Sequence, residues 1–391
     1  MSLRRCNPSL KFGSFRNYLY FCNVKQETKQ IRQTMKKVLK IALFSVLGLV
    51  VVAGVLVWME FGPLIKGAMS CEKLDEGMYY MEYAGDDGFD ELMKRGGCAN
   101  INVLANYITE FLSKGHFKTA EIDCPLMPVG CSTLTVSTPD GGVMMARNFD
   151  FPYGTAMILH TTPDDGFESI TTFSTDFFGF GENYKPEGFQ NQFMALASLF
   201  MALDGINEKG LAIAVLDAGD KVVTKQDTPK PDLTTTSAVQ YLLKNAANVK
   251  EALELLRGID MNSDPGSAYH LSMADATGRS VAVEYVDNKM VVTDSPFVTN
   301  HYLCKEKFEV GLHESDHRHE KLMEQYQKTG GVMNEEHLTK AIASVTQLPE
   351  KGAIVGGTLW TMVMDLKHPS VTYYSRRHFD KPLHFTLSRT N

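Results

Sequence analysis

Residues 129–151 read VGCSTLTVSTPDGGVMMARNFDF, and this stretch decides the fold that we expect. Two runs of strand-forming residues flank a Pro-Asp-Gly-Gly turn, a pattern typical of an antiparallel hairpin. Cys131 stands at the head of the first run, and Arg147 and Asp150 stand at the end of the second. A tight turn returns both charged residues to the cysteine. The hairpin therefore holds either a buried cysteine with a polar end or a nucleophile with its charge partners.

Strand and helix signals alternate in groups along the rest of the chain. Apolar runs predict further strands, and residues 203–210 predict a turn. Apolar residues at helical spacing predict helices, with Gly258 as a stop. The predicted strands are 157–163, 168–174, 211–219, 269–275, 280–286, 290–293, 358–365 and 371–375, and the predicted helices are 105–112, 234–258 and 319–328. Antiparallel groups of strands with helices between them indicate a layered α+β domain.

Composition places most of the chain among ordinary globular proteins. The 391 residues are 44% hydrophobic and 22% charged, which allows one large or two medium domains. The net charge of −7 gives no electrostatic reason to expect a nucleic-acid partner. No residue pattern calls for a cofactor, and the sequence leaves the oligomeric state open.

Residues 41–59 depart from this average and predict a transmembrane anchor. They read IALFSVLGLVVVAGVLVWM, without a charge, and about 20 apolar residues suffice to cross a bilayer as a helix. Lysines at positions 36, 37 and 40 precede this run, so the positive-inside rule places residues 1–40 in the cytoplasm. The domain that follows is then expected on the extracytoplasmic face of the membrane.

Two alternatives concern this N-terminal part. A start at Met35 would place residues 1–34 outside the native chain. A signal peptide cleaved before Cys71, after the small residues Ala68 and Ser70, would release a secreted protein. That position is far from the apolar run, which favours an uncleaved anchor.

The seven cysteines match no zinc or redox spacing. In an exported domain, Cys71, Cys98 and Cys124 could pair among themselves. A catalytic cysteine has to remain a free thiol.

A nucleophilic cysteine needs a base, because the thiolate is the reactive form. No histidine follows Cys131 closely in sequence, although His160, His270 or His301 could approach it in space. A chain break before Cys131 offers another base, since an α-amino group has a reference pKa of about 7.7–8.0. Such a site also needs a cation, a carboxylate for the ammonium and donors for an oxyanion.

The sequence at this point resembles a known family. Cys-Ser-Thr at a strand start, ARNFDF on the return strand and LDGINEKGLAIAVLDAG further on are similar to the linear amide C–N hydrolases of the N-terminal nucleophile superfamily. That group includes choloylglycine hydrolase, penicillin V acylase and the acid ceramidase branch. The resemblance implies a four-layer αββα sandwich, preceded here by one transmembrane helix. It covers residues 131–391, which we expect to form the catalytic domain.

The resemblance also implies a role for particular residues. Cys131 matches the nucleophile, whose freed amine is the base. Arg147 matches the arginine beside the thiolate, and Asp150 matches the aspartate that holds the α-amino group. FVTNHY places Asn300 at an oxyanion-hole asparagine, and SDHRHEKL places Arg318 at the second arginine of the family.

Two departures bear on the substrate. Asp217 stands where bile salt hydrolases have an oxyanion-hole asparagine, and an ionised carboxylate cannot donate a hydrogen bond. Either a backbone N–H replaces it, or Asp217 is protonated or binds another group; the ceramidase branch is similar in having an acidic residue here. Residues 61–130 also precede Cys131, like the pro-segment of that branch and of isopenicillin N acyltransferase. We therefore expect a self-catalysed cut between Gly130 and Cys131, with 61–130 as the small subunit.

The expected function is hydrolysis of a small-molecule, linear, non-peptide amide through a thioester on Cys131. The alternatives are an acyltransferase or aminopeptidase of the same superfamily and, from another class, a non-catalytic membrane-anchored binding module. A run of histidines could form a metal site, but a solvated helix face is the better interpretation of this run, and we expect no metal. An aromatic run is either core or the wall of an acyl pocket. The histidines are His313, His317 and His319, and the aromatics are Phe177, Phe178, Phe180 and Tyr184.

Overall fold

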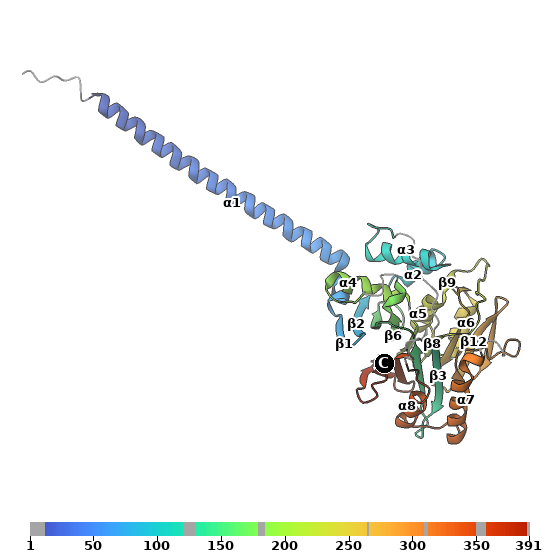
Figure 1. The fold of residues 1–391 in the computed structure, drawn as a ribbon. Coiled ribbons are helices and arrows are strands. Elements are labelled where there is room, and N and C mark those ends of the chain that lie inside the picture. Colours follow the sequence, from blue (N-terminus) through green and yellow to red (C-terminus); the bar gives the residue numbers. More distant parts are fainter. Residues whose placement is uncertain are drawn as a thin grey trace, which may run out of the picture. The chain divides into compact units, whose positions relative to one another are not determined.

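The computed structural model describes residues 12–119, 130–178, 184–263, 266–308, 312–348 and 357–388, without the side chains of 12–19, 22 and 312–316 (Figure 1). The chain divides into two units, which meet at Gly62 and Pro63. The first unit is helical, and the second contains the sheets.

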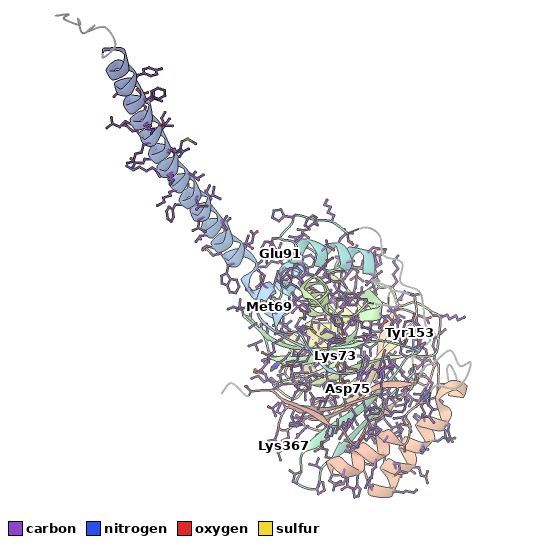
Figure 2. The ribbon with its side chains drawn as sticks, turned by 60° about the vertical axis from the view of Figure 1, so that its left-hand side comes forward. Met69, Lys73, Asp75, Glu91, Tyr153 and Lys367 are labelled. Atoms are coloured by element: carbon purple, nitrogen blue, oxygen red, sulfur yellow. The ribbon has the colours of Figure 1, made fainter. Side chains whose placement is uncertain are left out.

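Helix α1, Phe12–Met69, is far longer than the apolar run that predicted it. From Asn23 to Met69 it is long and apolar enough to cross a membrane, judged by length and composition. It continues through Pro63 to a last turn in the second unit, where Leu64 and Ala68 are buried. Figure 2 labels Met69 at the end of the helix.

A nine-stranded sheet has the order β1-β2-β5-β6-β7-β8-β11-β12-β13. Within the described residues its neighbours are antiparallel except for β2 and β5, so the sheet is mixed. Part of the predicted turn at 203–210 is strand β7, which leaves the turn at 208–210. The strands are β1 Glu72–Asp75, β2 Met78–Gly85, β5 Ala156–Pro163, β6 Ser169–Ser174, β7 Asp204–Asn207, β8 Ala212–Asp217, β11 Tyr269–Ala274, β12 Ser280–Val286 and β13 Lys289–Asp294.

A six-stranded antiparallel sheet has the order β14-β3-β4-β15-β16-β17 and contains the predicted hairpin. Gly130 is opposite Asp150, Cys131 is opposite Phe149, and the turn carries Gly141 at a φ of 77°. Its strands are β3 Gly130–Ser137, β4 Val143–Asp150, β14 Phe297–Val298, β15 Thr358–Asp365, β16 Ser370–Ser375 and β17 Leu383–Thr386. A third, parallel pair joins β9 Asp232–Thr234 to β10 Asp260–Asn262.

The two large sheets pack face to face, with helices on their outer sides. Strand β8 contacts both β3 and helix α5, so the helix and the smaller sheet cover opposite faces of the larger one. Helices α7 and α8 contact β3, next to which Figure 1 shows them. Asparagine or threonine side chains cap the starts of α3, α5, α6 and α8. The remaining helices are α2 Phe89–Lys94, α3 Ile101–Leu112, η2 Thr175–Phe178, α4 Phe189–Ala195, η3 Leu196–Phe200, α5 Thr235–Asn245, α6 Val249–Arg257, α7 Leu312–Thr329 and α8 Glu335–Ala343.

Residues 63–119 are an integral part of the second unit. Strand β2 pairs with β5 along its whole length, and Lys244 of α5 forms a buried ion pair with Asp87 at 2.8 Å. The disulfide considered from the sequence is wrong for Cys71 and Cys98, which are both free thiols. Sγ of Cys71 contacts the carbonyl of Pro186 and Sγ of Cys98 contacts the hydroxyl of Ser237, so the two thiols have different partners. Cys124 lies outside the described residues.

Candidate active site

The nucleophile candidate sits at the N-terminal end of β3, in the centre of the smaller sheet. Directly opposed residues of an antiparallel pair share a face, and successive residues alternate. Cys131, Thr133 and Arg147 therefore face the larger sheet, where Thr133 hydrogen-bonds Ser272 of β11 at 2.9 Å. Gly130, Ser132 and Asp150 face the helices. Cys131 itself is 0% exposed.

Arg147 occupies the face between the two sheets. Its Nη2 lies 3.6 Å from Sγ of Cys131 and donates to the carbonyl of Val215 at 3.2 Å. Its Nη1 lies 2.5 Å from a carboxylate oxygen of Asp204, on β7. The guanidinium also stacks over Phe149, with 4.8 Å from Cζ to the ring centroid. Arg147 therefore places a fixed positive charge beside the thiol.

Asp150 occupies the opposite face, beside the backbone of Gly130. Its Oδ1 accepts a hydrogen bond from the Thr358 hydroxyl at 2.5 Å, whereas its Oδ2 is buried and has no hydrogen-bond partner among the described residues. Nη1 of Arg318 lies 3.9 Å from that Oδ2, an ion-pair distance. A Cβ added to Gly130 would come within 3.1 Å of the same oxygen. Asp150 thus points at the residue that precedes the nucleophile.

Asn300 and Arg318 hold the backbone of Cys131. The N–H of Cys131 donates to Oδ1 of Asn300 at 2.7 Å, and Nη2 of Arg318 donates to the same oxygen at 2.8 Å. Nη1 of Arg318 donates to the carbonyl of Cys131 and to the Ser132 hydroxyl. The structure therefore brings Arg147, Asp150, Asn300 and Arg318 together around Cys131, as the sequence predicted.

Asp217 approaches the site through its backbone. Its carbonyl accepts a hydrogen bond from Nδ2 of Asn300 at 2.9 Å. Its carboxylate accepts hydrogen bonds from the N–H of Gly219 and from the Ser267 hydroxyl, each at 2.6 Å. The side chain of Asp217 is thus an acceptor that shapes the end of β8, and its carbonyl orients Asn300.

Burial controls the protonation of the nucleophile in this chain. It raises the pKa of the Cys131 thiol from 9.0 to about 12, against the opposing effect of Arg147. Burial also raises the pKa of Asp150, although Arg318 and Thr358 oppose this rise. In the continuous chain, burial therefore favours the neutral thiol.

Sequence reasoning missed two groups that build this site, Asp204 and Glu284, and considered His270 only as a possible base. Asp204 pairs with Arg147, and it stands within the LDGINEKGL motif that carried the family resemblance. Nε2 of His270 donates to the carbonyl of Thr299 at 2.8 Å, and its Nδ1 lies 3.2 Å from Oε1 of Glu284. Glu284 accepts the N–H groups of residues 303 and 304, so this pair fixes the loop that bears Asn300. Only the motif around Asp204 was a usable sequence signal.

The structure also bears on the two remaining hypotheses, a metal site at the histidines and an acyl pocket at the aromatic residues. No group of three or more metal-ligating side chains occurs within the described part of the chain, which includes His317 and His319 but not the side chain of His313. Phe177 packs on Phe151 with ring centroids 4.9 Å apart, and Phe151 in turn stacks on Phe149. The aromatic run thus reaches the strand end beside Cys131. Phe180 lies outside the described residues.

The comparison with family models finds a match over less than half of the chain, which begins at the nucleophile candidate. Residues 131–302 match the linear amide C–N hydrolases, choloylglycine hydrolase family. The match begins at Cys131, and it confirms the resemblance that the residues around Cys131 predicted. Members of this family are amide hydrolases, which supports an enzymatic function.

Two curated relatives match parts of this chain. The penicillin V acylase of Pectobacterium atrosepticum is 36% identical over 102 residues, 24% of this chain and 27% of the relative. The bile salt hydrolase/transferase of Clostridium perfringens is 25% identical over 177 residues, 42% of this chain and 51% of the relative. The matches thus span about a quarter and about half the length of these relatives.

A solved structure supports the fold. The crystal structure of a mutant conjugated bile acid hydrolase from Clostridium perfringens aligns with a TM-score of 0.50 and 16% identity, and covers 67% of this chain and 93% of that chain. At this identity the likeness concerns the fold alone. It confirms an α+β fold with mixed sheets, like that of the N-terminal nucleophile hydrolases.

Proposed function

We propose that this chain is an N-terminal cysteine amidohydrolase, which cleaves a linear, non-peptide amide through a thioester on Cys131. The cut that exposes the nucleophile lies between Gly130 and Cys131. The proposal applies to residues 131–391 as the catalytic part and to residues 61–130 as the pro-segment, which remains as a small subunit.

The observation that carries this proposal is Oδ2 of Asp150. A buried carboxylate oxygen without a hydrogen-bond partner is rare and costly, and Oδ2 of Asp150 is such an atom among the described residues, with only the ion-pair contact to Arg318 at 3.9 Å. It lies beside Gly130, next to the Cys131 nitrogen that cleavage would turn into an α-ammonium. An ammonium at this position would supply the missing donor. The cost that Asp150 bears in the continuous chain would then be relieved by cleavage.

The exposure step balances without a co-reactant other than water. Sγ of Cys131 attacks the carbonyl carbon of Gly130, the C–N bond breaks, and the thiol proton passes to the nitrogen of Cys131. Water then hydrolyses the thioester, which leaves a carboxylate on Gly130 and both a thiol and an α-amine on Cys131. Cleavage thereby creates a base, the α-amine of Cys131, on the same residue as the nucleophilic thiol.

Turnover uses the same atoms. The α-amine takes the proton of Sγ, and Arg147 at 3.6 Å stabilises the resulting thiolate. The thiolate attacks the substrate carbonyl, with Nδ2 of Asn300 as an oxyanion donor. The ammonium, held by Asp150, protonates the leaving amine, and water then hydrolyses the thioester to the acid. Arg318 and the carbonyl of Asp217 orient Asn300 throughout.

We also propose the four-layer αββα description and an uncleaved membrane anchor at residues 41–59. The layer order is supported by α5 on one sheet and α8 on the other. The anchor is supported by Leu64 and Ala68, which belong to the core of the second unit. A cleavage before Cys71 would remove both side chains from that core. The catalytic domain is then attached to the extracytoplasmic face of the membrane.

A panel of amides tests the function on the purified full chain. We expect hydrolysis of at least one N-acyl amine, N-acyl amino acid, penicillin V or bile acid conjugate, and its loss in Cys131→Ser. Cys98→Ser is the matched control, because Cys98 is another buried free thiol and lies before Cys131, against Ser237 of α5. Equal turnover by Cys131→Ser and the parent chain would contradict the proposal. Intact-mass analysis checks the cut, and a continuous chain that turns over substrate would refute it.

A further inference from the structure

Asp204 is a fully buried carboxylate that the proposed reaction steps do not use. It belongs to β7 of the larger sheet, yet its Oδ2 lies 2.5 Å from Nη1 of Arg147 in the smaller sheet. The same oxygen accepts a hydrogen bond from Nε1 of Trp360 at 3.0 Å. Asp204 and Arg147 are both 0% exposed. This ion pair therefore crosses the interface between the two sheets, directly behind the nucleophile.

Charge balance indicates what Asp204 does there. A buried cation without a counterion is strongly unfavourable. The other carboxylate near the site, Asp150, lies on the opposite face of the hairpin and is paired with Arg318. Among the described residues, Asp204 is thus the carboxylate in ion-pair contact with Arg147.

The geometry also fixes which nitrogen of the Arg147 guanidinium binds which partner. Asp204 binds Nη1, which leaves Nη2 for Sγ of Cys131 and the carbonyl of Val215. The ring of Phe149 covers the face of the guanidinium, so its plane cannot tilt freely. Arg147 therefore has little room to move if Asp204 loses its charge.

We propose that Asp204 is a positioning residue for the chemistry at Cys131: it directs Arg147 toward the thiol and limits the positive charge that the thiol meets. The inference rests on the proposed function, since it assigns Cys131 as the nucleophile. Arg147 delivers this effect, because Asp204 contacts Arg147 and not the sulfur.

Other charged groups face this assembly from each side. Asp150 of β4 and Arg318 of α7 act on the Cys131 thiol, with opposite signs. Tyr373 of β16 lies near Asp204, and burial keeps its pKa far above the usual value, so it is neutral. Burial raises the pKa of Asp204 too, and Arg147 and the N–H of Trp360 oppose that rise.

The test is the pH profile of Cys131 alkylation by iodoacetamide, read by mass spectrometry, together with kcat and KM. Asp204→Asn keeps the size of the side chain and an acceptor for Trp360, but removes the negative charge. We expect the midpoint of alkylation to fall by about one pH unit, the usual effect of one nearby charge. We expect kcat to fall about threefold with KM little changed, since a thiolate whose pKa is one unit lower is a poorer nucleophile by about that factor.

Asp260→Asn is the matched control, because Asp260 is also a buried aspartate and lies on β10, away from Cys131. An unshifted midpoint in Asp204→Asn, or an equal shift in Asp260→Asn, would overturn the inference. If Asp204→Asn does not fold by circular dichroism, Trp360→Phe replaces it. This variant removes the N–H that opposes the raised pKa of Asp204, so Asp204 loses part of its negative charge and the midpoint should fall; an unchanged midpoint again overturns the inference. The alkylation profile is independent of any substrate, so a failure of the proposed function alone would appear as absent turnover with the shift intact.

Discussion

Two buried ion pairs flank the proposed nucleophile, one on each face of the β3–β4 hairpin. Arg147 pairs with Asp204 between the sheets, and Arg318 pairs with Asp150 on the side of the helices. The two charges of each pair cancel, so the site has no net charge while Cys131 carries a neutral thiol. Transfer of the thiol proton to an α-amine keeps it neutral, because the new thiolate and ammonium also cancel. The residues are thus arranged for an internal proton transfer that needs no net change of buried charge.

His301, next to Asn300 in sequence, makes the site sensitive to acid. Burial and the neighbouring His319, with ring centroids 4.6 Å apart, lower the pKa of His301 from 6.5 to about 4. A histidine whose pKa is lower in the folded state than in the unfolded state stabilises the fold fully when the pH is above its unfolded-state pKa. This contribution is lost as the pH falls from about 6.5 to about 4. We expect Tm to decrease less in His301→Gln than in the parent chain as the pH falls from about 6.5 to about 4.

Differential scanning calorimetry at several pH values measures this effect. His368→Gln is the control, because the side chain of His368 is 69% exposed and should leave the pH dependence of Tm unchanged. The assignment would be wrong if His301→Gln lost as much Tm between pH 6.5 and 4 as the parent chain does.

At the scale of elements, the hairpin start leaves little room for a side chain at position 130. A Cβ on Gly130 would lie 3.0 Å from Cβ of Asp150 and 3.1 Å from Nε2 of Gln347, so these neighbours would have to shift by a few tenths of an ångström. We expect Gly130→Ala to push Asp150 out of line and to slow the cut at Cys131 at least tenfold, because the scissile bond moves with the strand. Intact-mass time courses during expression would measure the rate. Gly258→Ala, at the end of α6, should process normally; processing of Gly130→Ala at the parent rate would argue against this account.

The local sequence pattern predicted helices and strands well where residues that are close in sequence are also close in space. The β3–β4 hairpin placed Arg147 and Asp150 from spacing alone, and resemblance placed Asn300 and Arg318. Asp204 was missed because β7 was predicted as a turn, and because a contact between two sheets leaves no periodic trace in the sequence. The parallel pairing of β2 with β5 was equally hidden, since it joins distant segments.

At the scale of the whole molecule, the proposed cut would leave two pieces without a covalent link. Residues 131–391 contain two cysteines, Cys131 and Cys304, and both are free. Association then depends on the β2–β5 pairing, the buried Lys244–Asp87 ion pair and an aromatic cluster around Phe200. Phe200 contributes the ring from the large piece, and it lies 5.2–5.5 Å by ring centroids from Phe89, Tyr107 and Phe111 of the small piece.

Phe200→Ala should therefore weaken the association of the two pieces. The buried ring is lost and a cavity remains, which typically costs about 3–5 kcal/mol. We expect the parent pieces to co-elute in size-exclusion chromatography and to separate on a denaturing gel without reductant. The pieces of Phe200→Ala should separate at a lower urea concentration than those of the parent. Phe379→Ala, which removes a ring packed within the large piece against Tyr374, should change this concentration little. Pieces that stay joined on the gel until reductant is added would refute the non-covalent association.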